Sequence, residues 1–123
     1  MQLNHLNLTV KDVPATRTFF ETYFNFRCTD PKLNDSLSVL TGPDGFLLVL
    51  MNQRFNDKEN HTYPDAFHIG FYLDNQEAVI AMHQRLQDGG IVLEQAPQPM
   101  RKTFGFYVTF DSIMIEITTP VKE

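Results

Sequence analysis

The sequence has little that would tie it to a secreted or membrane-bound setting. Its 123 residues include one cysteine, Cys28, which cannot form a disulfide within the chain, so a reducing cytoplasm and a small buried hydrophobic role are expected. The longest apolar run, Phe46 to Met51, has six residues, which predicts a buried strand and is far too short for a membrane span. The first residues, MQLNHLN, lack the basic and apolar regions of a secretion signal.

Excess positive charge and nucleotide-binding motifs are also missing. The chain has 10 Lys and Arg against 15 Asp and Glu, a net charge of −5, which argues against non-specific binding to nucleic acids. The sequence contains no glycine-rich phosphate loop and no Ser/His/Asp set, which argues against nucleotide chemistry and acyl transfer. With 42% hydrophobic and 20% charged residues, the composition is that of an ordinary globular protein, and the length fits one domain.

What the sequence does contain is one pattern that occurs twice. HLNLTVKD begins at His5 and HIGFYLDN begins at His68, 63 residues later, and a helical pattern follows each copy. In both copies apolar residues alternate with polar ones, which is typical of a half-buried strand. We therefore predict a duplicated unit with one histidine at the same place in each copy.

The first half predicts the order βαβββ. Asp12 is expected to cap the first helix, Pro14 lies in its first turn, and four aromatic residues between 19 and 24 form its apolar stripe. That stripe must pack on the apolar face of the first strand, so the face with His5 points away from the helix. The predicted strands are Leu3–Val10, Phe26–Asp30, Leu37–Thr41 and Phe46–Met51.

The second half predicts the same order. Asp74 and Glu77 resemble a capping box, and Gly89 and Gly90 are expected to end the second helix. Ala96–Met100 reads as a proline-containing loop. The predicted strands are Ala66–Leu73, Ile91–Gln95, Thr103–Phe110 and Ile113–Thr119.

These elements predict an α+β fold built from two βαβββ modules related by a pseudo-two-fold axis. The modules span about 1–52 and 66–120 of a single domain of residues 1–123, with a polar linker at about 53–65. Mixed sheets would curl around a concave site, with the helices on the outer face. The linker would serve as a lid or a crossover.

Three side chains on the faces away from the helices predict a metal site. Glu116 is a carboxylate in an otherwise apolar strand, where a charge needs a partner. With His5 and His68 it makes a set of two histidines and one carboxylate, which suits a first-row divalent metal and leaves positions open for substrate or water. The alternative for each histidine is an ordinary hydrogen-bonded residue of a strand.

The sequence resembles the vicinal oxygen chelate superfamily, which contains glyoxalase I, bleomycin-resistance proteins, extradiol dioxygenases and fosfomycin-resistance thiol transferases. NHLNLTVKDVPATRTFFETYFNF resembles its opening strand and helix, AFHIGFYLDN its fifth strand, and FYVTFDSIMIEI its closing hairpin. The resemblance covers essentially the whole chain. It implies that His5, His68 and Glu116 match the metal ligands of the superfamily.

Departures from the family pattern narrow the chemistry. Val49 stands where glyoxalase I-like members have a further carboxylate, so the three-ligand pattern remains. Asn7 stands where fosfomycin enzymes usually carry a threonine, and the closing turn is shortened to Asp111-Ser112. The resemblance implies a divalent metal (Zn, Ni, Mn or Fe(II)) that chelates neighbouring oxygens of a small substrate, for lyase, isomerase, thiol-transferase or dioxygenase chemistry. The alternative is a metal-free protein, similar to the bleomycin-resistance proteins, that sequesters a small molecule.

The remaining candidates are secondary. Tyr72 and Tyr107 fall on the polar faces of their strands and could act as hydrogen-bond donors or acids. Arg101 and Lys102 could bind an anionic substrate, and His61 and His83 are not expected to be ligands. The resemblance also implies a homodimer, in which His5 pairs with His68 and Glu116 of either the same chain or a second copy.

Overall fold

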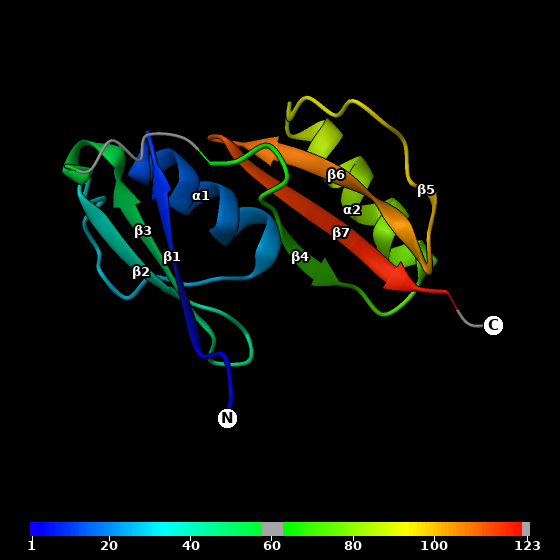
Figure 1. The fold of residues 1–123 in the computed structure, drawn as a ribbon, viewed down its shortest axis with the longest axis horizontal. Coiled ribbons are helices and arrows are strands. Elements are labelled where there is room, and N and C mark those ends of the chain that lie inside the picture. The colour runs from blue at the N-terminus through cyan, green and yellow to red at the C-terminus, as the bar shows by residue number, and fades with distance from the viewer. Residues whose placement is uncertain (58–62, 122–123) are drawn as a thin grey trace. The chain divides into compact units, whose positions relative to one another are not determined.

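The computed structural model describes residues 1–57 and 63–121. The chain divides into two units, Met1–Thr62 and Tyr63–Glu123. In each unit one helix lies along one face of a sheet that contains both parallel and antiparallel neighbours (Figure 1). The predicted α+β fold with mixed sheets and one helix on each sheet is confirmed. None of the helices in the described part of the chain is long and apolar enough to cross a membrane.

The first unit contains a three-stranded sheet in the order β1-β3-β2, with β1 parallel and β2 antiparallel to β3. Helix α1 begins after Asp12, whose carboxylate accepts a hydrogen bond from the Ala15 amide at 3.0 Å, and Pro14 lies in its first turn as predicted. It ends at Asn25, which adopts a left-handed conformation with φ 58°. The elements are β1 (His5–Val10), α1 (Val13–Phe24), β2 (Leu37–Thr41), β3 (Leu47–Asn52) and a short 3-10 helix, η1 (Gln53–Phe55).

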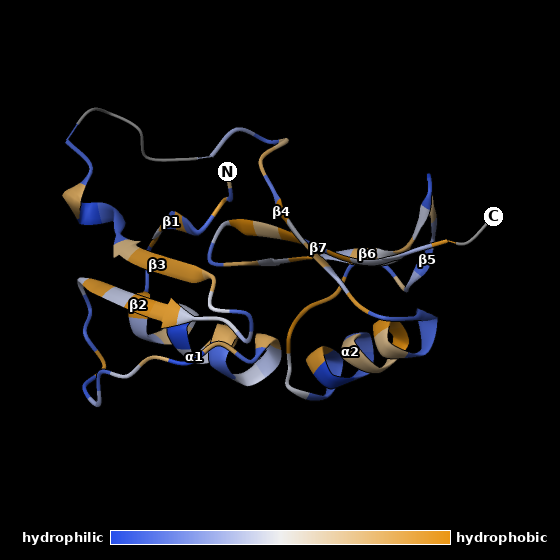
Figure 2. Ribbon diagram, turned by 90° about the horizontal axis from the view of Figure 1, so that it is seen from below, coloured by the Kyte–Doolittle hydropathy of each residue, from blue (hydrophilic) through white to orange (hydrophobic). Residues whose placement is uncertain are grey.

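The core of this unit lies between α1 and its sheet. Helix α1 packs on β2 and β3, and Phe19 and Phe20 of the predicted aromatic stripe are buried there. The strands supply the opposite wall, and in the hydropathy colouring of Figure 2 β3 is strongly hydrophobic above α1. The buried strand residues are Leu8, Val10, Leu40, Leu48 and Leu50.

The second unit contains a four-stranded sheet in the order β4-β7-β6-β5, in which only β4 and β7 are parallel. Helix α2 packs on β6 and β7, and its buried residues are Val79, Met82 and Leu86. Facing them are Ile113, Ile115 and Ile117, which are fully buried. The elements are β4 (Ile69–Tyr72), α2 (Gln76–Asp88), β5 (Gln98–Met100), β6 (Thr103–Phe110) and β7 (Ile113–Pro120).

The segment after α2 differs most from the prediction. Residues 91–95 form no strand, and β5 instead lies in Gln98–Met100, where a proline-containing loop was predicted. A proline is tolerated there because β5 is an edge strand and needs no donor on its outer side. The backbone of the segment is held by α2 instead, since Ile91 donates to the Leu86 carbonyl and His83 bonds to that of Gln95.

Smaller differences concern boundaries. The strand predicted for Phe26–Asp30 is reduced to a single bridge between Arg27 and Thr41. The cap of α2 is Asn75, which accepts from the Ala78 amide at 2.8 Å, rather than the predicted Asp74. The strand predicted from Ala66 begins only at Ile69, so His68 precedes β4 by one residue.

Candidate functional site

We call the face of each sheet that its helix does not cover the open face. On the open face of the second unit, Glu116 of β7 lies in register with Gly70 of β4 and Tyr107 of β6. Its neighbours in β7, Ile115 and Ile117, point into the core on the other face. The alternation of side chains along β7 therefore places the Glu116 carboxylate in the middle of the sheet, where 23% of the side chain is exposed.

Two side chains converge on the same carboxylate oxygen. The Tyr107 hydroxyl donates a hydrogen bond of 2.9 Å to Oε2 of Glu116. Nε2 of His68 lies 3.2 Å from that oxygen, and the ring of His68 meets the ring of Tyr107 edge-on at 5.8 Å. The structure therefore brings three predicted site residues into one group, which we call the Glu116 group: His68, Tyr107 and Glu116.

The electrostatics of this group keep the phenol protonated. The hydrogen bond to Glu116, with contributions from burial and from the negative charge of the carboxylate, raises the pKa of Tyr107 above its ordinary value. Tyr107 is therefore a fixed hydrogen-bond donor to Glu116 at neutral pH.

The tautomer of His68 follows from its second contact. Nδ1 lies 2.9 Å from the Ala66 carbonyl oxygen, which only accepts hydrogen bonds, so Nδ1 carries a proton. In the neutral ring, Nε2 then presents a lone pair toward Oε2 of Glu116, and two electron-rich atoms at 3.2 Å need a cation between them. In the imidazolium form, Nε2 is instead a donor and the two side chains make an ion pair.

His5 has the same arrangement of its ring in the first unit. It is the first residue of β1, it is exposed, and its Nδ1 lies 2.7 Å from the side-chain oxygen of Asn4. An amide oxygen accepts, so Nδ1 is the donor and Nε2 keeps its lone pair. In both histidines a carbonyl oxygen thus holds Nδ1 and leaves Nε2 to face another group, which for His68 is Glu116, and this is a common arrangement in metal-binding histidines.

The open face of the first sheet is otherwise mainly apolar. Val49 lies in register with Asn7 of β1 and Val39 of β2, so β3 places an aliphatic side chain where Glu116 stands in β7. Within residues 1–57 and 63–121, no group of three or more His, Cys, Asp and Glu side chains lies close enough to hold a metal ion. The second unit supplies a pair, His68 and Glu116, and the first unit supplies His5.

The other predicted residues lie apart from the Glu116 group. Tyr72 is 73% exposed on the open face of β4, and its side chain makes no hydrogen bond, ion pair or ring contact with the described residues. Arg101 and Lys102 are exposed in the turn between β5 and β6. His83 is half-buried on α2, where its Nε2 lies 3.0 Å from the Gln95 carbonyl, and His61 lies outside the described residues.

One residue that contacts the site was not predicted. The side-chain oxygen of Gln95 accepts a hydrogen bond of 3.1 Å from the Tyr107 amide. Residues 91–95 were predicted to form a strand. That prediction gave no reason to expect the Gln95 side chain to bond the Tyr107 amide in place of a neighbouring strand. The proline at position 99, which weakens the neighbouring strand, was the available signal.

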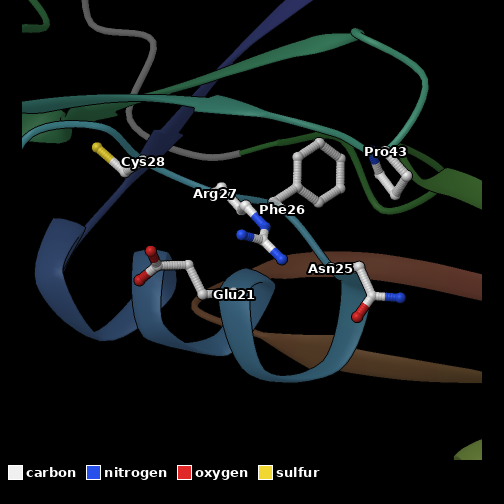
Figure 3. A pocket seen from close by; sticks show the side chains of 6 residues that line it. All are labelled: Glu21, Asn25, Phe26, Arg27, Cys28 and Pro43. Carbon is white, nitrogen blue, oxygen red and sulfur yellow. The ribbon is translucent and has the colours of Figure 1, made fainter.

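A separate hollow of about 660 Å³ lies at the end of α1 in the first unit. Arg27 and Glu21 face it from the connecting segment and the helix, and the thiol of Cys28 stands at its side (Figure 3). None of the residues predicted for the metal site lines it. The lining residues are Glu21, Asn25, Phe26, Arg27, Cys28 and Pro43.

Comparisons with known proteins agree with this fold. Residues 2–120 match the family model described as the Glyoxalase/Bleomycin resistance protein/Dioxygenase superfamily. A possible glyoxalase from Bacillus cereus is 36% identical, with a TM-score of 0.77 and coverage of 96% of this chain and 98% of that chain. A comparison with curated proteins gave no significant match.

Two further solved structures share the fold at lower identity. Lactoylglutathione lyase from Agrobacterium tumefaciens is 18% identical, with a TM-score of 0.74 and coverage of 96% of this chain and 92% of that chain. A genomically encoded fosfomycin resistance protein from Listeria monocytogenes is 21% identical, with a TM-score of 0.75 and coverage of 98% and 94%. At these identities the likeness concerns the fold alone.

Proposed function

Because the chain belongs to the glyoxalase/bleomycin resistance protein/dioxygenase superfamily, we propose that it is a metal-dependent enzyme that acts on a small molecule with two neighbouring oxygen atoms. The ligands of the divalent metal would be His5, His68 and Glu116. The metal would be Zn, Ni, Mn or Fe(II), all of which accept imidazole nitrogen and carboxylate oxygen. The whole chain, residues 1–123, would form one domain of this superfamily in the cytoplasm, with modules at about 1–52 and 66–120.

The observation that carries the proposal is the arrangement of His68. Nδ1 lies 2.9 Å from the Ala66 carbonyl oxygen and Nε2 lies 3.2 Å from Oε2 of Glu116, so that in a neutral ring the lone pair of Nε2 faces the carboxylate. A spacing of this size suits two ligands of one metal ion, since metal–nitrogen and metal–oxygen bonds are each roughly 2.0–2.2 Å for zinc. His5 presents its Nε2 in the same way.

A bound metal would act as a Lewis acid on oxygen atoms of the substrate. The residues of the chain have separate tasks. Tyr107 donates to Glu116 and so fixes the rotation of the carboxylate, while Ala66 fixes the plane of the His68 ring. Tyr72, exposed on the same open face, is proposed as a donor or acid toward the substrate, and Glu116 and Tyr107 as groups that hold or move its protons.

The reaction class remains a choice among lyase, isomerase, thiol-transfer and dioxygenase chemistry. The lactoylglutathione lyase described above shares the fold and represents one of these classes. Val49 removes the carboxylate that a four-ligand lyase site would have, and this favours reactions that need three protein ligands. We also propose that the protein is a homodimer.

A metal-free binding protein is the second candidate. If His68 is an imidazolium, Glu116 is satisfied by an ion pair and by the Tyr107 hydroxyl without any metal. The apolar residues on the open face of the first sheet would then contact an apolar ligand. These residues are Leu37, Val39, Leu47, Val49 and Met51.

Metal binding by the untagged protein separates the two candidates. The protein is purified without a chelating tag, stripped, and titrated with Zn, Ni, Mn and Fe(II), and bound metal is measured by elemental analysis and calorimetry. We expect stoichiometric binding of at least one of them by the wild type. His68→Ala and Glu116→Ala should weaken it by more than about 100-fold, because even outer partners of metal ligands are worth roughly 10–100-fold.

Glu94→Ala is the matched control, since Glu94 is an exposed carboxylate that makes no side-chain hydrogen bond or ion pair among the described residues. It should bind metal as the wild type does. Absence of stoichiometric metal in the wild type would exclude the enzyme proposal and leave the binding protein. Metal that persists in both ligand variants would show that other residues hold it.

A further inference from the structure

The backbone of Tyr107 is held from the outer side of the sheet. Strand β5 pairs with β6 only over Thr103–Gly105, so it does not reach Tyr107. The amide of Tyr107 donates instead to the side-chain oxygen of Gln95 at 3.1 Å. Because this amide points away from β7, Tyr107 and Glu116 form a non-hydrogen-bonded pair, in which side chains of neighbouring strands lie closest together.

Gln95 is itself fixed by helix α2. Its carbonyl oxygen lies 3.0 Å from Nε2 of His83, and since a carbonyl only accepts, this nitrogen carries a proton. The His83 ring packs edge-on against Phe106, with centroids 5.0 Å apart and planes at 88°. Phe106 precedes Tyr107 in β6. Helix α2, the loop that contains Gln95 and strand β6 are thus connected through these contacts.

We propose that Gln95 is a positioning residue for the Glu116 group. Its amide oxygen replaces the missing strand partner of Tyr107 and fixes the backbone of that residue, so that the phenol stays aligned with Oε2 of Glu116. The role of the group as a metal site rests on the proposed function, but the positioning itself does not. The order of contacts runs from His83 through Gln95 and Tyr107 to Glu116.

Three substitutions isolate the contact. Gln95→Met keeps the length of the side chain and removes the acceptor, while Gln95→Glu keeps an acceptor for the Tyr107 amide. Gln87→Met is the matched control, because Gln87 is exposed on α2 and its side chain makes no hydrogen bond within the described ranges. Circular dichroism and thermal melting establish that each variant is folded.

The first measurement is made without metal, by NMR. In Gln95→Met we expect the Tyr107 amide to exchange its hydrogen about 10-fold faster or more. A factor of ten corresponds to a loss of roughly 1.4 kcal/mol in the free energy of opening this amide. We also expect a changed carboxyl carbon shift for Glu116. Gln95→Glu and Gln87→Met should keep the wild-type values. An unchanged Tyr107 amide and Glu116 carboxyl in Gln95→Met would overturn the proposal, whether or not the protein binds metal.

The second measurement is metal affinity in a double-mutant cycle. Gln95→Met should weaken binding by about 3–10-fold, less than an outer partner in direct contact with a ligand. The same substitution should have no further effect in a Tyr107→Phe background, because Gln95 acts only through the phenol. A purely structural role would weaken both backgrounds equally and contradict the proposal. If the wild type binds no metal, the proposed function fails, and the NMR result alone decides the role of Gln95.

Discussion

At the scale of single residues, one oxygen atom concentrates the chemistry of the second unit. Oε2 of Glu116 receives the Tyr107 hydroxyl and faces Nε2 of His68, while the backbone of Ala66 holds the opposite nitrogen of the same ring. A carboxylate surrounded in this way has a defined direction before any ligand arrives. Pre-orientation lowers the cost of binding a metal because less side-chain freedom is lost.

Tyr107→Phe tests this orientation. We expect metal affinity to fall by about 10-fold, the lower end of the effect of outer partners, since the carboxylate loses the hydrogen bond from the Tyr107 hydroxyl. In the metal-free protein the loss of a hydrogen bond to a charged acceptor should lower the free energy of unfolding by about 1 kcal/mol, reduced by partial exposure. Calorimetric titration and urea denaturation measure the two effects.

Tyr72→Phe is the control for that experiment. Tyr72 lies on the same open face but is 73% exposed, and its side chain makes no hydrogen bond, ion pair or ring contact within the described residues. It should therefore leave metal affinity and stability unchanged. Equal losses in the two variants would show that Tyr107 acts through general packing rather than through Glu116.

At the scale of elements, the hairpin between β6 and β7 closes through a strained turn. Asp111 and Ser112 both have positive φ, 47° and 67°, which matches the tight turn that favours Asn-Gly or Asp-Gly. A residue with a Cβ atom is disfavoured there. Ser112→Gly should raise the free energy of unfolding by about 0.5–1 kcal/mol, measured by urea denaturation. Ser112→Ala keeps the strain and should give no gain; a similar gain from alanine would contradict the explanation.

The same hairpin depends on a glycine near its open end, Gly105, which lies opposite Thr118. A Cβ atom on Gly105 would overlap the Ile117 carbonyl oxygen and lie 2.7 Å from the Thr118 methyl, so the strands would have to separate. Gly105→Ala should lower the free energy of unfolding by about 2–3 kcal/mol, as forced overpacking does. Gly70→Ala is the matched control in β4, where the nearest atom is 3.9 Å away, and it should change stability by less than about 0.5 kcal/mol. The free energies of unfolding are measured by denaturant titration. Equal losses in the two variants would contradict this explanation.

The strands that could be predicted from the sequence are those in which apolar and polar side chains alternate and which pair with a neighbouring strand. β2 and β6 have their predicted bounds, and the face that Glu116 shares with Tyr107 follows from alternation alone. In residues 91–95 the apolar side chains of Ile91 and Leu93 also alternate with others, and this pattern predicted a strand. The prediction was wrong because the segment does not pair with a neighbouring strand. Register and hydrogen bonds such as that of Gln95 depend on which strands become neighbours, and a single sequence does not contain that information.

At the scale of the whole chain, each unit begins with a strand and a helix, but two strands follow in the first unit and three in the second, and their open faces differ. The second presents a carboxylate, a tyrosine and a histidine, and the first presents His5 beside aliphatic side chains of β2 and β3. The clearest difference is that the first unit has Val49 where the second has Glu116. Among the described residues neither unit brings three ligand side chains together, so the proposed metal site of His5, His68 and Glu116 would need residues of both kinds of unit. Two copies of the chain can meet this requirement as well as one.

Mixing of variants tests whether two copies share their sites. His5→Ala and Glu116→Ala chains are refolded together, and mixed dimers are verified by native mass spectrometry. We expect part of the metal binding to return, because a mixed dimer can combine the intact His5 of one copy with the intact His68 and Glu116 of the other. A mixture of His68→Ala with Glu116→Ala is the control: both ligands belong to the second unit, so no arrangement of two copies restores a site. If mixed dimers form and bind no metal, His5 pairs with the ligands of its own chain, and the homodimer, where it forms, has complete sites in each copy.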